Sequence, residues 1–292
     1  MKRIGKVWID GGVVDADDAR VGVFDRGFLY GDSVYEVVRT VGGRPFALGE
    51  HLDRLEGSAS RIALVLPPRD LIDRAVYEVI GALGLADLYV RIVVTRGAGP
   101  IGLDPALAEH PALIAIALPL VRPDEALYRN GAEVAIVSPR RNSPGAVDPM
   151  VKSGNYLTSV IAAAEAKKKG AYEAVMCDAA GRIAEGASSN LFVVRGGRLA
   201  TPPLSVGLLE GITRRHVIAL ARGLGFYVDE APLWQSDLEA ADEAFLTSSI
   251  RGVMPVSRAE GKPIGKGRPG PITLRLSAAY DDEMVRATTP SA

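Results

Sequence analysis

Cysteine and histidine are scarce in this sequence, which limits the kinds of site that it can form. Cys177 is the only cysteine among 292 residues, so an intrachain disulfide is excluded and a reducing compartment is expected. The three histidines and Cys177 form no cluster at the usual spacings of metal ligands. The sequence therefore predicts neither a disulfide framework nor a metal centre.

A basic excess and long apolar runs are also lacking. The 34 lysines and arginines are balanced by 35 aspartates and glutamates, giving a formal net charge of −1, so there is no basic excess to neutralise nucleic-acid phosphates. The most apolar stretch, residues 111–121, is too short to span a bilayer and contains two prolines. Residues 1–10 contain no apolar run of the length found in signal peptides. We expect a soluble cytoplasmic protein that binds neither nucleic acid nor membranes.

What the chain does contain is ordinary for a globular protein. Hydrophobic residues make up 48% and charged residues 24%, and 292 residues are enough for one large or two medium domains. In the first part, apolar periodicity and turn residues predict a hairpin at 6–14, helices at 50–62 and 69–83, and strands at 88–95 and 112–118. Asp32 or Ser33 can cap a helix over residues 34–39, but that segment is β-branched, so a helix and a strand both remain open.

A change of character near residue 120 divides the chain. Residues 119–130 are polar, contain Pro123 and lack periodicity, which is typical of an interdomain linker. Beyond it the pattern predicts helices at 155–168, 213–224, 236–241 and 271–284, and strands at 173–178, 181–184, 191–195, 198–201, 226–231 and 243–246. Strands mixed with helices indicate the α+β class. The expected organisation is an N-terminal domain at 1–120, a linker at 121–131 and a C-terminal domain at 132–292.

One lysine, Lys152, stands at the start of a predicted helix, directly after a proline-rich loop. Pro144 and Pro149 each disfavour helical geometry in the residue before them. A lysine at such a corner, among apolar neighbours, can lose its charge through desolvation and act as a nucleophilic amine. An isolated lysine is more often a solvated surface group. The segment Glu185-Gly-Ala-Ser-Ser-Asn-Leu-Phe192, further along the chain, favours the reactive alternative.

Five short segments carry a resemblance when they are taken together, although each alone is weak. In chain order they are Asp25-Arg-Gly-Phe-Leu-Tyr-Gly-Asp32, Glu50-His-Leu-Asp-Arg-Leu55, Lys152-Ser-Gly-Asn-Tyr-Leu157, Glu185-Gly-Ala-Ser-Ser-Asn-Leu-Phe192 and Leu209-Glu-Gly-Ile-Thr-Arg214. The sequence resembles, over nearly its whole length, the class IV pyridoxal-phosphate-dependent aminotransferases. That family includes branched-chain amino-acid aminotransferase, D-amino-acid aminotransferase and aminodeoxychorismate lyase. The resemblance implies a fold type IV enzyme, with two α/β domains, pyridoxal 5′-phosphate at their interface, and a homodimeric assembly.

The resemblance also implies roles in cofactor binding. Lys152 matches the lysine that forms the Schiff base and moves the substrate proton, Glu185 the carboxylate at the pyridinium nitrogen, and Tyr156 the tyrosine near the phenolic oxygen. Arg54 matches the phosphate-binding arginine; its alternative is a surface pair with Glu50 at helical spacing. Surface exposure of Glu185 and helix packing of Tyr156 are likewise alternatives. The remaining cofactor contacts that the resemblance implies are Asn190, Gly211, Ile212, Thr213, Ser248 and Ser249.

Positions on the substrate side follow from the same resemblance, and simple packing is the alternative for several of them. They are Tyr30, Tyr35, Arg39, Tyr89, Arg91, Ile250 and Arg251. Tyr30 is expected to reach the pocket of the partner subunit. Ile101 and Leu103 stand where D-amino-acid aminotransferases typically carry a polar clamp, which favours an apolar pocket. Arg251 stands where branched-chain enzymes tend to have a small residue, and we hypothesise that it clamps the substrate carboxylate.

The predicted activity is transamination of branched-chain L-amino acids (leucine, isoleucine and valine) with 2-oxoglutarate as acceptor, through a Schiff base on Lys152. Residues 35–39, Tyr-Glu-Val-Val-Arg, are closer to the D-type pattern, so a D-amino-acid or (R)-amine transaminase remains open. Val37 and Val38 weaken the interpretation as an aminodeoxychorismate lyase, and a non-catalytic pyridoxal-phosphate-binding protein is a further alternative. The sequence leaves the preferred enantiomer undecided.

Overall fold

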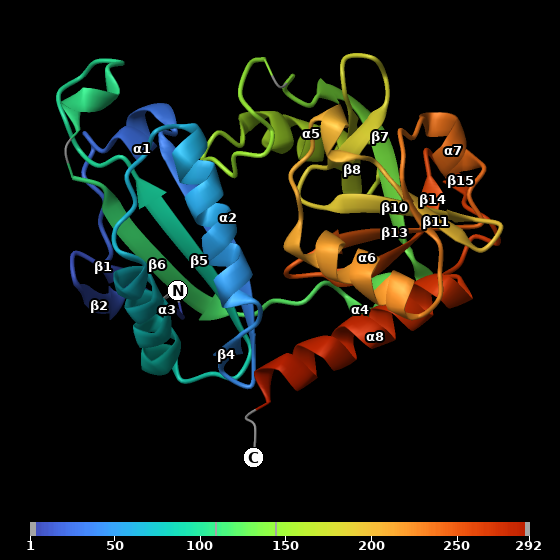
Figure 1. Cartoon of the computed structure of the whole chain (residues 1–292), viewed down its shortest axis with the longest axis horizontal. Helices are drawn as coiled ribbons and strands as arrows, with labels where there is room; N and C mark the ends of the chain where they lie inside the picture. The colour runs from blue at the N-terminus through green and yellow to red at the C-terminus, as the bar shows by residue number, and fades with distance from the viewer. Residues whose placement is uncertain (1–3, 109, 144, 290–292) are drawn as a thin grey trace. The chain divides into compact units, whose positions relative to one another are not determined.

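The computed structural model of the chain describes residues 4–108, 110–143 and 145–289. The chain forms two compact units, which are considered separately (Figure 1). Unit 1 comprises Met1–Val121, Val151–Asn155 and Met284–Ala292, and unit 2 comprises Arg122–Met150 and Tyr156–Glu283. Unit 1 therefore includes a short segment, Val151–Asn155, that is flanked in the sequence on both sides by unit 2.

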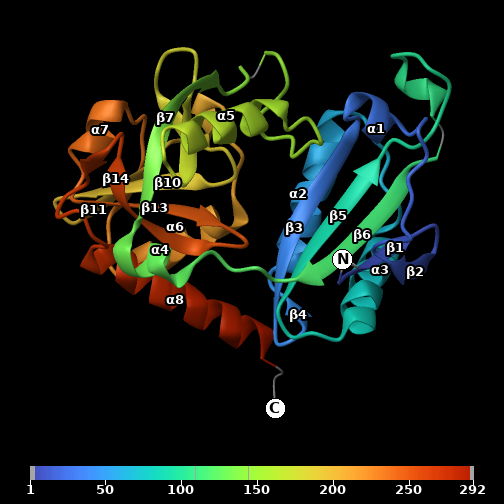
Figure 2. The same cartoon turned by 180° about the vertical axis from the view of Figure 1, so that it is seen from behind.

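Unit 1 is built on an antiparallel six-stranded sheet with the order β2-β1-β6-β5-β3-β4. The strands are β1 (Lys6–Ile9), β2 (Gly12–Asp15), β3 (Ser33–Val41), β4 (Arg44–Pro45), β5 (Leu88–Thr95) and β6 (Ala112–Pro119). The helices are α1 (Arg26–Tyr30), α2 (Leu48–Arg61) and α3 (Arg69–Leu83), with a 3₁₀ turn, η1, at Pro105–Leu107. Figure 2 shows the sheet in front of α2 and α3, so both long helices cover the same face of it.

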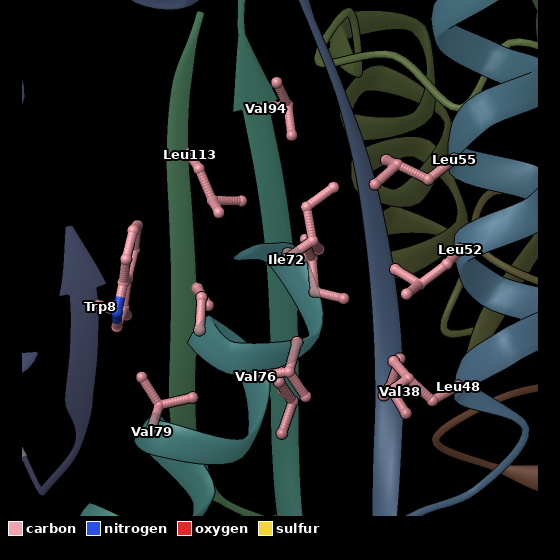
Figure 3. Packing of buried hydrophobic residues seen from close by; sticks show 14 of the residues in the cluster. Trp8, Val38, Leu48, Leu52, Leu55, Ile72, Val76, Val79, Val94 and Leu113 are labelled. Atoms are coloured by element: carbon pink, nitrogen blue, oxygen red, sulfur yellow. The ribbon is translucent and has the colours of Figure 1, made fainter. Parts of the chain in front are cut away.

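The core of unit 1 lies between this sheet face and the two helices. Figure 3 shows the leucines of α2 pointing toward β3 and the apolar side chains of α3 toward β5 and β6. The residues labelled there are Trp8, Val38, Leu48, Leu52, Leu55, Ile72, Val76, Val79, Val94 and Leu113. Because successive side chains of a strand point to opposite faces, Val34 and Val38 enter this core, and Tyr35, Val37 and Arg39 face the other side of the sheet.

The structure decides between the two alternatives for residues 34–39, which form part of β3 and are not helical. Seven consecutive residues of β3 pair with β5, so each β-branched side chain packs in a sheet. Asp32 does not cap a helix there; its carboxylate accepts hydrogen bonds from Arg26 and Arg96. The predicted hairpin, the helices at 50–62 and 69–83 and the two later strands are confirmed within a few residues.

Unit 2 contains a nine-stranded mixed sheet with the order β12-β11-β10-β13-β14-β7-β8-β9, and β15 pairs with β14. Its strands are β7 (Ala132–Arg140), β8 (Glu173–Cys177), β9 (Ile183–Gly186), β10 (Asn190–Arg195), β11 (Arg198–Thr201), β12 (Val228–Glu230), β13 (Glu243–Ser248), β14 (Gly252–Ala259) and β15 (Lys262–Pro263). Its helices are α4 (Glu125–Asn130), α5 (Leu157–Lys168), α6 (Ile212–Gly223) and α7 (Gln235–Glu239), with a 3₁₀ turn, η2, at Leu204–Val206. Helix α8 (Pro271–Thr288) starts in unit 2, and its residues from Met284 onward are grouped with unit 1.

Two segments of unit 2 differ from the expectation. The stretch expected to be a linker contains α4, whose Tyr128 hydroxyl donates a hydrogen bond to the carbonyl of Arg251. A helix of this length is too short to show apolar periodicity. The central strand β14 was not predicted, because Pro255 interrupts its apolar run and a proline argues against a central strand. Among the described helices, none combines the length and the hydropathy needed to cross a membrane.

Candidate functional site

The main chain around Lys152 is held by β3 and α2 of unit 1. The Tyr35 amide donates to the Lys152 carbonyl at 2.9 Å, and the Gly154 amide donates to the Ser33 carbonyl at 3.0 Å. On the other side, the Lys152 amide donates to the Ser58 hydroxyl of α2 at 3.1 Å. Residues 151–155 thus lie along β3 like a short additional strand. The backbone of Lys152 is fixed, and only its side-chain torsions can move the amine.

The amine of Lys152 lies against an aromatic side chain. Its Nζ is 4.5 Å from the centroid of the Tyr35 ring, and the guanidinium carbon of Arg91 is 3.9 Å from the same centroid. Both contacts are cation–π interactions, which stabilise a cation over an aromatic face. Tyr35 is buried, so its ring is a fixed surface for the two cationic side chains.

Four of the predicted substrate residues share the sheet face that carries Tyr35. In the antiparallel register of β3 and β5, Arg39 is opposite Tyr89 and Val37 is opposite Arg91. Arg91 Nη1 donates to the Tyr89 hydroxyl at 3.4 Å, whereas the buried Nε of Arg39 has no hydrogen-bond partner among the described residues. Two guanidinium groups and two tyrosines on one face suit the binding of a carboxylate.

Tyr30 does not belong to this face. It ends α1, where its hydroxyl accepts a hydrogen bond from the Gly102 amide at 3.2 Å and its ring lies 5.1 Å from the Arg26 guanidinium carbon. The expectation that Tyr30 reaches a partner subunit stays a prediction.

Arg54 on α2 forms a buried ion pair that the sequence did not reveal. Its Nε and Nη2 donate to the two carboxylate oxygens of Glu36, both at 2.7 Å, and His51 Nδ1 lies 2.7 Å from Glu36 Oε2. Burial alone would raise the pKa of Glu36, but the charge of Arg54 and the hydrogen bonds from Arg54 and His51 lower it to about 2. Burial also lowers the pKa of His51, against the raising effect of Glu36. Because the Glu36 carboxylate only accepts, the neutral His51 ring donates its Nδ1–H.

Glu185 is the corresponding buried carboxylate of unit 2, at the end of β9. Arg141 Nη2 lies 2.8 Å from its Oε1, and its Oε2 accepts hydrogen bonds from Asn190 Nδ2 and the Leu209 amide, both at 3.2 Å. These contacts come from a cation and from N–H donors, so they stabilise a carboxylate anion. Arg141 was missed in the sequence, because a single arginine in a loop has no local pattern.

The start of α6 offers hydrogen-bond donors for an anion. Gly211 is its N-cap residue and makes no side-chain cap, so the first-turn N–H groups of Ile212 and Thr213 have no capping side chain from this position. A Cβ atom on Gly211 would lie 2.1 Å from Asn190 Oδ1, so glycine lets the backbone approach Asn190 closely. The Thr213 hydroxyl is 3.0 Å from the hydroxyl of Tyr280 on α8.

The other predicted cofactor residues of unit 2 lie at element ends. Tyr156 is the N-cap residue of α5. Ser248 ends β13 and its hydroxyl accepts a hydrogen bond from the Arg251 amide at 3.4 Å, and Ser249 and Ile250 form the turn into β14.

The guanidinium of Arg251 is engaged by groups of its own unit. Its Nη1 lies 2.7 Å from Glu173 Oε2, its Nε donates to the Tyr172 hydroxyl at 3.1 Å and its Nη2 to the Ser188 hydroxyl at 3.0 Å. Glu173 is buried and had not been singled out in the sequence. The hypothesis that Arg251 clamps a substrate carboxylate stays a prediction, and a substrate would have to share this cation with Glu173.

Comparison with known proteins agrees with the sequence motifs. The family model "Amino-transferase class IV" matches residues 33–259. A branched-chain-amino-acid aminotransferase of Escherichia coli K12 is 34% identical over 287 residues, covering 96% of this chain and 93% of the relative.

Solved structures give the same result. A branched-chain amino acid aminotransferase from the source abbreviated T.th., solved with pyridoxamine 5′-phosphate, superposes with a TM-score of 0.93 at 32% identity, covering 99% of this chain and 97% of that one. The Thermoproteus uzoniensis branched-chain aminotransferase with norvaline gives 0.88 at 36%, covering 97% and 95%. The chain belongs to the class IV aminotransferases.

Proposed function

We propose that the protein is a pyridoxal-phosphate-dependent branched-chain amino-acid aminotransferase, with 2-oxoglutarate as the amino acceptor. The observation that carries the proposal is the packing of the Lys152 amine on Tyr35, at the sheet face that also holds Arg39, Tyr89 and Arg91. This face combines a primary amine with cations for carboxylates. An amino acid and a 2-oxo acid both need such groups.

The residues present fit the chemical demands of the cofactor. Pyridoxal phosphate supplies an electron sink and requires an amine, an anion for its ring nitrogen and donors for its phosphate. Lys152 and Arg54 of unit 1 are the amine and a phosphate cation in this proposal. The buried carboxylate of Glu185 and the uncapped start of α6 in unit 2 are the anion and the amide donors.

The residues of the chain then act as follows. Lys152 Nζ takes a proton from the substrate α-carbon and later returns one, which its side-chain torsions permit while its main chain stays fixed. Glu185 remains ionised beside the ring nitrogen because Arg141 and Asn190 hold it. Arg39 and Arg91 bind substrate carboxylates in fixed directions.

We propose a homodimer from the exposed apolar surface of unit 1. Phe28, Ile101 and Leu103 are 71%, 74% and 81% exposed, and Phe24 is exposed beside them in sequence. The Arg26 guanidinium donates to the Gly102 carbonyl, so α1 and this loop form one surface. A second copy would cover these side chains. Light scattering with size exclusion at micromolar concentration tests this: a monomer would contradict it.

We also propose a cytoplasmic location. The one cysteine, Cys177, is a free thiol and is buried, which fits a reducing compartment.

The central experiment is an absorbance titration of the reconstituted protein. L-leucine should move the visible band of the bound cofactor into the near ultraviolet, and 2-oxoglutarate should restore it. A response to D-alanine alone would instead support the D-amino-acid alternative, which Val37 favours because its side chain lies on the substrate face opposite Arg91. Release of pyruvate without an acceptor would support the lyase. Absence of any cofactor band would end the proposal.

A further inference from the structure

The ion pair of Glu36 and Arg54 is placed where one strand serves two purposes. Glu36 lies between Tyr35 and Val37 on β3, so its side chain points to the helix-covered face while theirs point to the substrate face. Its side chain is 0% exposed, whereas that of Arg54 is 14% exposed. The carboxylate is therefore inside the unit, and the guanidinium lies at the boundary between the interior and the surroundings.

The geometry of the pair fixes the guanidinium in direction and in plane. Two parallel bonds, from Nε and Nη2 to the two carboxylate oxygens, form a fork that admits one orientation. His51, on the same helix, donates to Glu36 Oε2 at 2.7 Å, so the carboxylate cannot rotate away. The two bonds use only part of the N–H donors that a guanidinium has. Arg54 is thus held rigidly without being exhausted as a donor.

Stability alone is a weak reason for such a pair. Apolar residues of similar volume commonly stabilise a core as well as a buried ion pair does, because two charges must be desolvated. A long arginine side chain also loses conformational freedom when it binds an anion, and a preformed fork removes that loss beforehand. The same face of α2 carries Ser58, which holds the Lys152 amide. The pair therefore lies in the framework that fixes the reactive lysine.

We propose that Glu36 is a positioning residue that orients Arg54 for the phosphate group of the cofactor, with His51 as its support. The inference rests on the proposed function, in which Arg54 binds that phosphate. Glu36 contributes by holding the guanidinium in one orientation, so it acts on the phosphate only through Arg54.

The test compares two probes of the apo protein, pyridoxal 5′-phosphate and pyridoxal, which lacks the phosphate. The ratio of their dissociation constants isolates phosphate recognition from the reaction with Lys152. Replacing Glu36 by Gln should weaken pyridoxal 5′-phosphate binding by about 10- to 100-fold, the range for hydrogen bonds to charged groups, and leave pyridoxal binding unchanged. His51→Gln, which keeps the ion pair, should give a smaller loss in the same direction.

A double-mutant cycle distinguishes positioning from other roles. In an Arg54→Lys background, Glu36→Gln should have no further effect on the ratio, because the group that it orients is gone. Thr40→Val is the matched control: its hydroxyl is a buried group on the same face of β3, bonded to the Ala86 carbonyl and the Leu88 amide. This control should leave the ratio as in the wild type even if the protein is destabilised.

Three outcomes would overturn the inference. Equal weakening of both probes by Glu36→Gln would show a structural role only. Tighter binding of pyridoxal 5′-phosphate would show that Glu36 competes with the phosphate for Arg54. Additive effects in the cycle would show that Glu36 acts independently of Arg54. A wild-type protein in which borohydride traps no pyridoxal 5′-phosphate on Lys152 would instead refute the proposed function, and the inference with it.

Discussion

Acidification should weaken the buried pair of Glu36 and Arg54, and its effect on stability follows from the lowered pKa. The ordinary value for glutamate is 4.5, and in the folded protein the pKa of Glu36 is about 2. At about 1.4 kcal/mol per pH unit, this difference corresponds to roughly 3 kcal/mol of stability. A lowered carboxyl pKa stabilises the fold above the unfolded value, so the contribution is complete above pH 4.5 and is lost as the pH falls toward 2.

Glu36→Gln isolates this contribution, because glutamine does not titrate. Between about pH 6 and about pH 3.5, the wild type should lose about 1.4 kcal/mol that the variant does not lose. The assay is urea unfolding of both proteins at a fixed protein concentration. The carboxyls of Asp32 and Asp178, whose pKa values are also lowered, titrate in both proteins and cancel in the difference. A wild-type-minus-variant difference that stays constant over this pH range would refute the reasoning.

Three further predictions concern other parts of the chain. Leu55→Ala should lower the free energy of unfolding by about 2–5 kcal/mol, since Leu55 is fully buried in the core of unit 1; a loss below about 1 kcal/mol in urea unfolding would contradict the packing. Arg251→Ala should cost about 3–5 kcal/mol by the same assay, because it leaves the buried Glu173 without its cation, and unchanged Michaelis constants for both substrates would contradict the carboxylate clamp. Lys152→Ala should abolish covalent trapping of pyridoxal 5′-phosphate by borohydride, measured by mass spectrometry; a label retained elsewhere would show that another amine reacts.

The sequence predicted those elements whose pattern is local. The helix at 69–83 was predicted with the bounds that the structure has, because apolar residues recur in it at helical spacing. Strand β14 was not, because Pro255 lies within it and only the neighbouring strands make it a strand. Residues 34–39 were ambiguous, since pairing with β5 and not local propensity decides their conformation.

The same distinction applies to the candidate site. Lys152, Glu185 and Arg54 were found from motifs, which are contiguous in the sequence. Their partners were not: Glu36 is 18 residues from Arg54, and the contact exists only because α2 packs on β3. Arg141 and Glu173 likewise act through tertiary contacts. A sequence can name the groups that carry the chemistry more readily than the groups that hold them.

The place of residues 151–155 in unit 1 has a consequence for how the protein is made. Ser58 and Lys152, which share a hydrogen bond, are separated by 94 residues. On the ribosome, the strands and helices of unit 1 emerge long before the lysine that completes them, and the intervening residues belong to unit 2. A nascent or truncated chain that ends before this segment can form most of unit 1 and still lack the reactive amine. Chain completion therefore acts as a checkpoint: an unfinished polypeptide has no Lys152 with which to capture the aldehyde.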